Sequence, residues 1–205
     1  MNKVSGGGFL AKGPSYRVPY RRRRKRVTDY SVRRILASSE DPRLVFRSSN
    51  SGVQVQIIRS EIIGDRLITQ ANSKELMKKF GWLGGTKNTP TSYLVGFLAG
   101  VKALKDGIMR ANLDKGLGTP TKGSKVFAAV KGAIDAGLEV PCSEDVMPSQ
   151  ERIEGKTLAK YIETVLEQHL EGDHRFSIFL SRGLEPKDLV NHFRSVKSRV
   201  EEYKH

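Results

Sequence analysis

The first regular pattern along the chain is an alternation of apolar and polar residues in its first half. Val53, Val55 and Ile57 alternate with Gln54 and Gln56. A period of two residues is typical of a strand with one buried face. Turn signals at residues 50–52 and 64–65 separate three such runs, at residues 44–46, 53–58 and 66–71. The pattern therefore predicts three antiparallel strands.

Elsewhere the apolar residues recur at three- and four-residue spacing, which is typical of helices. This spacing predicts helices at residues 30–38, 73–80, 91–109, 126–136 and 156–170, and another that opens at Glu185-Pro186. Thr28 or Asp29 is a suitable cap for the first of them. Residues 112–115 predict a short fourth strand. Gly96 and Gly100 lie one turn apart, and we expect them to let their helix pack closely on the sheet.

These elements predict an α+β fold with a small, mostly antiparallel sheet packed by helices. Residues 1–26 are rich in Gly, Pro and Arg and have too few aliphatic residues to fold alone. We interpret them as an extended basic arm that becomes ordered on its partner. Residues 27–140 form the α/β core, and residues 141–205 an acidic helical C-terminal extension. The helices of the extension pack either on the core or on partner proteins.

Charge is distributed very unevenly along the 205 residues, whose formal net charge is +14. Residues 1–40 hold 11 Lys and Arg against 2 Asp and Glu, whereas residues 141–205 hold 10 against 12. Residues 21–26 are six consecutive cations. Such a run repels itself unless a polyanion neutralises it and releases counterions. Because Tyr16 and Tyr20 can also stack on unpaired bases, the arm predicts nucleic-acid binding.

Other classes of chemistry find little support. Cys142 is the only cysteine, so an internal disulfide and a cysteine-rich zinc site are excluded, and we expect it to pack as a small residue. The four histidines lack the spacing of a metal site and are interpreted as solvated (His169, His174, His192, His205). We therefore predict no metal and no cofactor. No apolar run reaches signal-peptide or membrane-span length, which predicts a soluble intracellular protein without a membrane partner.

Two loops have alternative interpretations. The loop at residues 118–125 resembles a nucleotide-binding P-loop, but Lys122 precedes Gly123 and Ser124, which is the wrong order. Its glycine, threonines and lysines suit a backbone phosphate of a nucleic acid, or simply the capped start of a helix. The lone Trp82 either stacks on a base or anchors its loop by packing, and packing is favoured.

The polar outer face of the predicted sheet, with Arg47 and Arg59 beside the glutamines, also has two interpretations. It is either a binding face or an ordinary solvated face.

Many short segments, in order, resemble one ribosomal protein family. The segments are residues 13–24, 28–30, 42–45, 55–57, 79–82, 88–90, 93–103, 113–114 and 120–137. The family is the 5S-rRNA-binding protein of the large ribosomal subunit, called L-eighteen in bacteria and archaea and L-five in eukaryotes. The length of the chain fits the archaeal form. Over residues 155–205 the resemblance is weaker and lies more in helical character than in the individual residues.

The resemblance implies a structural ribosomal protein without catalytic activity, located on cytoplasmic ribosomes. It implies attachment of 5S rRNA to 23S rRNA in the central protuberance, beside neighbouring large-subunit ribosomal proteins. The RNA-binding residues that it implies are Tyr16, Arg17, Tyr20, Arg21, Arg22, Arg23, Arg24, Lys25, Arg26, Tyr30, Arg33, Arg43, Arg47, Asn50, Gln54, Gln56, Thr121, Lys122, Ser124 and Lys125. Two alternatives remain: a general RNA- or DNA-binding architectural protein, and an RNA-processing enzyme, for which no cluster of acidic residues is present.

Overall fold

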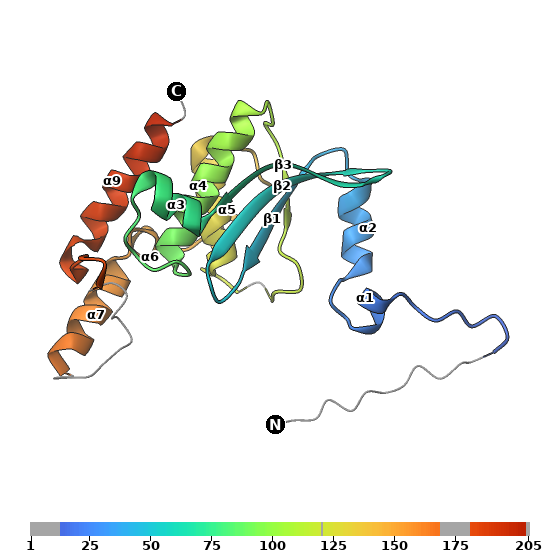
Figure 1. The fold of residues 1–205 in the computed structure, drawn as a ribbon, viewed down its shortest axis with the longest axis horizontal. Coiled ribbons are helices and arrows are strands. Elements are labelled where there is room, and N and C mark those ends of the chain that lie inside the picture. Colours follow the sequence, from blue (N-terminus) through green and yellow to red (C-terminus); the bar gives the residue numbers. More distant parts are fainter. Residues whose placement is uncertain (1–12, 120, 169–180, 204–205) are drawn as a thin grey trace.

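A four-stranded sheet with the order β3-β2-β1-β4 lies at the centre of the chain (Figure 1). The computed structural model describes residues 13–119, 121–168 and 181–203. The strands are β1 (Arg43–Ser48), β2 (Val53–Glu61), β3 (Gly64–Asn72) and β4 (Asn112–Asp114). The first three pair antiparallel, and β4 lies parallel to β1. The predicted α+β class, with a mostly antiparallel sheet, is confirmed.

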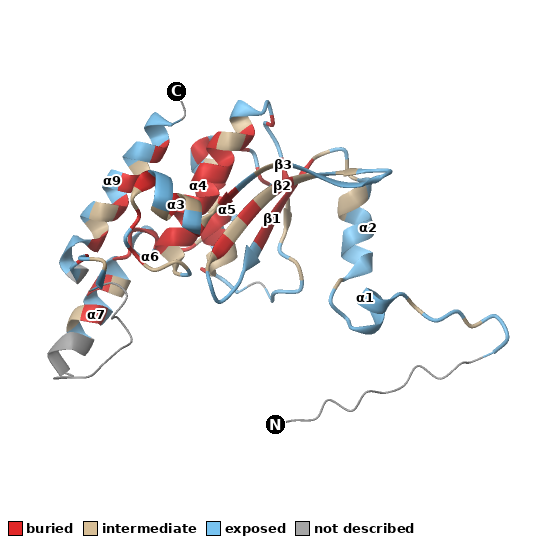
Figure 2. Ribbon diagram, in the orientation of Figure 1, coloured by how far each residue is buried: buried red, intermediate tan, exposed pale blue. Residues whose placement is uncertain are grey.

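The two faces of the sheet differ as the alternation predicts. Leu44, Val55 and Ile57 are fully buried on the core face, whereas Gln54 and Gln56 lie on the opposite face and are only partly covered. Figure 2 shows that the buried residues concentrate in this face of the sheet and in the two long helices beside it, α4 (Thr89–Lys105) and α5 (Lys125–Ala136). The outer face thus remains available for polar chemistry.

Helix α4 is the central helix of the core and differs in its ends from the predicted 91–109. Asn88 caps it, because its Oδ1 accepts a hydrogen bond from the Thr91 N–H at 3.0 Å, and Pro90 occupies the first turn. The helix ends at Lys105, where Gly107 takes a positive φ of 75°. The observed helix therefore begins two residues earlier and ends four residues earlier than the predicted one, because of the cap at its start and the turn after its end.

The close approach at Gly96 and Gly100 joins two helices, which corrects the expectation of packing on the sheet. A Cβ placed on Gly96 would overlap the carbonyl oxygen of Ala129 in α5. A Cβ on Gly100 would lie 2.8 Å from the Cβ of Ala136 and 3.0 Å from the carbonyl oxygen of Ala133. The glycines thus allow α4 and α5 to pack backbone to backbone.

The remaining helices are shorter than α4, and several match their predicted ranges. They are α1 (Arg21–Arg24), α2 (Tyr30–Ser38), α3 (Ser73–Phe80), α6 (Gln150–Glu154), α7 (Lys156–Gln168) and α9 (Leu189–Glu202), with 3-10 turns at Glu144–Val146 and Pro186–Asp188. Asp29 caps α2 by accepting from the N–H groups of Ser31 and Val32. Residue 170 and the apolar run 176–180 lie outside the described residues.

Helix α9 packs on the core, which decides between the two arrangements expected for the helices of the C-terminal extension. Leu189, Phe193, Val196 and Val200 are buried, and the ring of Phe193 lies 5.6 Å from that of Tyr93 in α4. The guanidinium of Arg199 donates to the carbonyl oxygen of Phe80 at 2.9 Å. The apolar stripe of α9 is therefore used within the chain.

Trp82 anchors its loop against this helix, and the packing interpretation is confirmed. The indole is 1% exposed and donates through Nε1 to Thr91 Oγ1 at 2.9 Å. His192 of α9 stacks on the indole and accepts a hydrogen bond from the Leu83 N–H at 3.0 Å. His192 is thus half-buried, and the prediction that it is solvated was wrong. His169, His174 and His205 lie outside the described residues.

The described part of the arm contains a hydrogen-bonded turn from Gly13 to Tyr16 and the single helical turn α1, which falls on the arginine run. The structure thereby corrects the expectation of a fully extended arm. All four arginines of the turn are exposed, and the N–H of Lys25 donates to the carbonyl oxygen of Arg21.

Cys142 is partly buried against the core, and burial raises the pKa of its thiol. Among the described residues, none of the helices is long and apolar enough to cross a membrane.

Substituting Gly96 with Ala tests the α4–α5 contact. The added methyl group must push the two helices apart, and we expect Gly96→Ala to lower the free energy of unfolding by about 3 kcal/mol. Gly118→Ala is the matched control, because the nearest atom to its Cβ would be 3.6 Å away. Urea unfolding of both variants measures the difference. Equal stability of the two would contradict the close packing.

The stacked histidine predicts a pH dependence of stability. Burial and the nearby charge of Arg199 lower the pKa of His192 below its usual value of 6.5. Because the unfolded chain then binds the proton more readily, stability is complete above about pH 6.5 and is lost as the pH falls through the folded-state pKa. We expect His192→Gln, which keeps an acceptor for Leu83, to flatten this part of the curve. Urea unfolding between pH 7.5 and 5 measures it, and an unchanged slope would refute the assignment.

Candidate nucleic-acid interface

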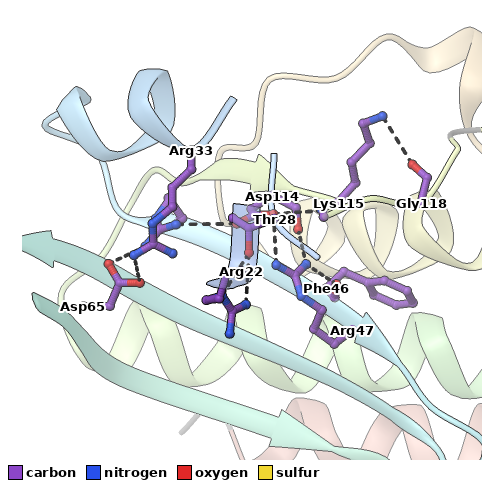
Figure 3. A network of polar contacts seen from close by, with 11 residues as sticks. Arg22, Thr28, Arg33, Phe46, Arg47, Asp65, Asp114, Lys115 and Gly118 are labelled. Atoms are coloured by element: carbon purple, nitrogen blue, oxygen red, sulfur yellow. Dashed lines mark hydrogen bonds and ion pairs between the residues drawn. The ribbon is translucent and has the colours of Figure 1, made fainter. Parts of the chain in front are cut away.

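A groove of about 530 Å³ runs between the arm, helix α2 and the end of the sheet where β1 and β4 finish. It brings together cations from five separate segments of the chain. They are Arg22 of α1, Arg33 of α2, Arg47 of β1, Lys115 after β4 and Lys125 of α5. Figure 3 labels the first four of these residues and shows their polar contacts. Folding thus collects charges that lie far apart in sequence.

Arg47 is held in place without being covered. Its guanidinium donates to the backbone oxygens of Phe46 and Asp114 and, at 3.2 Å, to Asp114 Oδ1, yet its side chain is 49% exposed. Gly116 makes room for it: a Cβ there would lie 2.9 Å from the guanidinium, and the residue has a positive φ of 69°. Arg47 therefore presents a fixed, half-exposed charge to the groove.

Arg43 lies beneath this surface and connects two carboxylates. Its Nη2 is 2.8 Å from Asp65 Oδ1, and its Nη1 is 3.5 Å from Asp114 Oδ2. Arg33 of α2 pairs with Asp65 at 2.8 Å (Figure 3). The resulting ion-pair chain runs from Arg33 through Asp65, Arg43 and Asp114 to Arg47. It fixes α2 and the end of β4 to the sheet.

The same geometry corrects the prediction that Arg43 is an RNA contact. Its side chain is only 3% exposed, and its Nε is buried without a hydrogen-bond partner. A guanidinium in this position cannot reach a ligand phosphate. Arg43 instead positions the two carboxylates, which in turn orient the exposed Arg33 and Arg47.

Asp65 stays ionised within the chain of ion pairs. Burial alone would raise the pKa of its carboxyl group, but hydrogen bonds and charges from Arg43 and Arg33 together outweigh burial and lower it. The described lining of the groove itself contains two acids, and both are engaged. Asp29 accepts from backbone N–H groups of α2, and Asp114 is shared by Arg43 and Arg47. The groove is therefore positive and favours an anionic ligand.

The outer face of the sheet continues from the groove through Arg47 and Ser48, which also line a second hollow of about 320 Å³. Gln54 and Gln56 both donate to Oε1 of Gln70 in that region, at 3.1 and 3.3 Å. These amides form a ladder across β2 and β3. Each amide group keeps a further donor, which suits hydrogen bonding to sugar, phosphate or base edges.

The other predicted residues are divided between the groove and the surface outside it. Arg22 is fixed by two hydrogen bonds to Thr28 Oγ1, at 3.0 and 3.1 Å (Figure 3). Tyr20 is 87% exposed, and Asn50 accepts from Lys87. Outside the groove lie the exposed residues Arg17, Tyr20, Arg21, Arg23, Arg24, Lys25, Arg26, Tyr30, Thr121 and Lys122, and the partly covered Tyr16. Ser124 and Lys125 line the groove itself.

Lys115 is a groove residue that the sequence analysis missed. Its amine lies 3.3 Å from the carbonyl oxygen of Gly118, in a glycine-rich turn directly after β4. The sequence feature that could have indicated Lys115 as a binding residue is a lysine in a glycine-rich turn directly after a predicted strand. No group of three or more His, Cys, Asp or Glu side chains that could hold a metal ion is found in the parts of the chain that the structure describes.

Comparison with known proteins gives one consistent result. Residues 14–110 and 105–143 match the family described as "Ribosomal large subunit proteins 60S L5, and 50S L18". "Large ribosomal subunit protein uL18" of Caldivirga maquilingensis is 50% identical, over 94% of this chain and 94% of that protein. The protein of the same name from Aeropyrum pernix is 48% identical over 96% and 92%, and that from Methanothermobacter thermautotrophicus 47% over 94% and 99%.

Removing Arg43 tests the ion-pair chain. Arg43→Gln leaves Asp65 and Asp114 without their shared buried cation, and we expect the free energy of unfolding to fall by about 3 kcal/mol. Arg33→Gln is the matched control, because it breaks a largely exposed pair and should cost less than about 1 kcal/mol. Urea unfolding at pH 7 compares them. Equal losses would show that Arg43 does not hold the network together.

Proposed function

The chain belongs to the family of ribosomal large subunit proteins 60S L5 and 50S L18, and from this premise we propose that it binds 5S rRNA. In this proposal it attaches 5S rRNA to 23S rRNA in the central protuberance. The relatives are archaeal proteins named for the large ribosomal subunit, so a structural role in the ribosome, rather than catalysis, is the role of this family. The RNA partners are the more specific part of the proposal.

The observation that carries the proposal is the positive groove. Five cations from separate segments line it against two acids, Asp29 and Asp114, and among the described residues only Arg33 and Arg47 of the five have an ion-pair partner. A protein gains nothing in stability by gathering unpaired charges of one sign, and each charge weakens the folded state by repulsion. A polyanion reverses this cost by releasing counterions when it binds. The groove therefore suits a nucleic-acid backbone.

We assign different tasks to the arm and the core. The arm, residues 1–26, contributes affinity through phosphates, and the core, residues 27–140, fixes the position and orientation of the RNA. The proposed contacts are Tyr16, Arg17, Tyr20, Arg21, Arg22, Arg23, Arg24, Lys25, Arg26, Tyr30, Arg33, Arg47, Asn50, Gln54, Gln56, Thr121, Lys122, Ser124 and Lys125. Arg43 supports them from beneath.

Folded RNA is the better candidate than duplex DNA for physical reasons. Proteins recognise RNA through shape and through unpaired bases that stack on aromatic rings. Tyr20 stands exposed directly before the arginine run. The acidic C-terminal extension, residues 141–205, would repel a phosphate backbone over much of its surface, and we propose that it contacts neighbouring ribosomal proteins instead. A general RNA- or DNA-binding architectural role is the alternative.

Replacing the four arginines of α1 with Ala tests the arm. We expect weaker 5S rRNA binding and a salt dependence whose slope falls by about 0.7–0.9 for each lost phosphate contact. All four side chains are exposed and the turn buries no residue, so the fold should remain intact. Filter binding or fluorescence titration over a salt series measures the slope.

The matched control removes four cations away from the groove: Lys78, Lys131, Lys160 and Lys187 are replaced by Ala. It changes the net charge by the same amount, so it should leave the slope almost unchanged. Equal effects of the two variants would show that only net charge matters, and would contradict an arm that contacts phosphates.

A further inference from the structure

A separate hollow of about 490 Å³ lies where helices α4 and α5 begin, facing α6 and α7. The described residues that line it are Asn88, Thr89, Pro90, Gly123, Ser124, Lys125, Arg152, Thr157, Leu158 and Tyr161. Ser124 and Lys125 line both this hollow and the positive groove. The two depressions therefore adjoin at Ser124 and Lys125.

The charge of the hollow is positive and is not neutralised by the described residues. Lys125 and Arg152 make no ion pair there, and the described lining contains no carboxylate. The charge of Lys87 acts on Lys125 and, together with burial, lowers the pKa of its amine. Two cations, Lys125 and Arg152, therefore line one small space, and a bound anion would relieve their repulsion.

Two polar side-chain atoms at the hollow are buried without a partner. They are Nδ2 of Asn88 and Oγ of Ser124. Asn88 uses its Oδ1 to cap α4, so its amide hydrogens remain available. Ser124 stands at the cap position of α5, but its side chain does not cap the helix. Unpartnered buried donors of this kind carry a cost that a ligand with acceptor oxygens removes.

We propose that this hollow holds a backbone phosphate of an rRNA nucleotide, as a contact distinct from those of the arm. The Arg152 guanidinium and the Lys125 amine bind the phosphate oxygens. The buried Ser124 hydroxyl and Asn88 amide, whose residues are only partly covered, turn toward the hollow on binding and donate to the same group or to the adjoining sugar. Arginine grips phosphate in a bidentate manner, and a helix start adds free N–H groups. The proposal rests on the proposed function and extends it by naming Arg152 and Asn88.

The route of the RNA strand follows from the shared residues. A strand that lies along the groove from Arg22 past Arg47 reaches Ser124 and Lys125 before it enters the hollow. Arg152 then contributes a cation from the otherwise acidic extension. Leu158 and Pro90 supply an apolar wall, and the volume of the hollow is within the range of sites that hold a nucleotide-sized group.

The test compares the double variant Lys125→Gln/Arg152→Gln with the control Lys131→Gln/Lys160→Gln, which loses the same charge outside the hollow. Binding is measured over a salt series with 5S rRNA alone and with 5S and 23S rRNA together. In one of these two binding experiments, we expect the double variant to bind about tenfold more weakly than the control. We also expect the slope of its salt dependence to fall by about 0.7–0.9. A change with 5S rRNA alone assigns the phosphate to 5S, and a change only in the ternary mixture assigns it to 23S.

Binding equal to that of the control in both experiments, with 5S rRNA alone and with the two RNAs together, would overturn the proposal. The arm variant separates this result from failure of the proposed function: if the α1 variant still weakens binding, RNA binding stands and only the phosphate site is lost. Urea unfolding verifies that the variants fold. If the double variant does not fold, Arg152→Gln alone decides, because within the described residues this exposed side chain makes no hydrogen bond or ion pair.

Discussion

The buried guanidinium of Arg43 is the constraint on which the binding surface depends. A buried cation must keep its anionic partners, because loss of either leaves an uncompensated charge in the interior. Arg43 meets this requirement with Asp65 of β3 and Asp114 of β4, and these carboxylates reach the exposed Arg33 and Arg47. One buried charge thereby fixes helix α2, the short parallel strand and the turn after it. The groove exists because these elements are held at one end of the sheet.

Charged side chains occur in two arrangements, paired with opposite charges in the core and in positive excess along the binding surface. In the core the acids are matched: Glu75 pairs with Lys79 and Lys102, and their hydrogen bonds and charges lower its carboxyl pKa although burial alone would raise it. In the described arm, the groove and the adjoining hollow, cations outnumber acids, and only Arg33 and Arg47 of the groove cations are ion-paired among the described residues. The first arrangement stabilises the fold, and the second costs stability until a polyanion binds. Family membership and physical chemistry thus indicate the same partner, ribosomal RNA.

Local patterns predicted much of the fold. Strict alternation predicted β2, Asp29 predicted the start of α2, and the resemblance indicated the ribosomal family. What the sequence could not supply were partners far apart along the chain. Gly96 indicated a close approach but not that its partner is α5, and β4 is too short for its direction to be predicted from a pattern.

The environment of His192 was predicted wrongly because its partner, the Leu83 N–H, lies 109 residues away in the sequence. Arg43 looked like a surface cation because nothing nearby in sequence reveals its carboxylates. Arg152 was missed because it lies in an acidic region.

The most direct test of specific RNA recognition is a titration of the full chain with 5S rRNA and, separately, with duplex DNA of equal charge, across a salt series. Counterion release weakens both interactions as salt rises, but contacts to RNA shape and unpaired bases do not depend on it. We expect 5S rRNA binding to persist at salt concentrations where DNA binding is lost. Parallel loss of both would contradict it, and would leave a basic protein that binds polyanions without distinction.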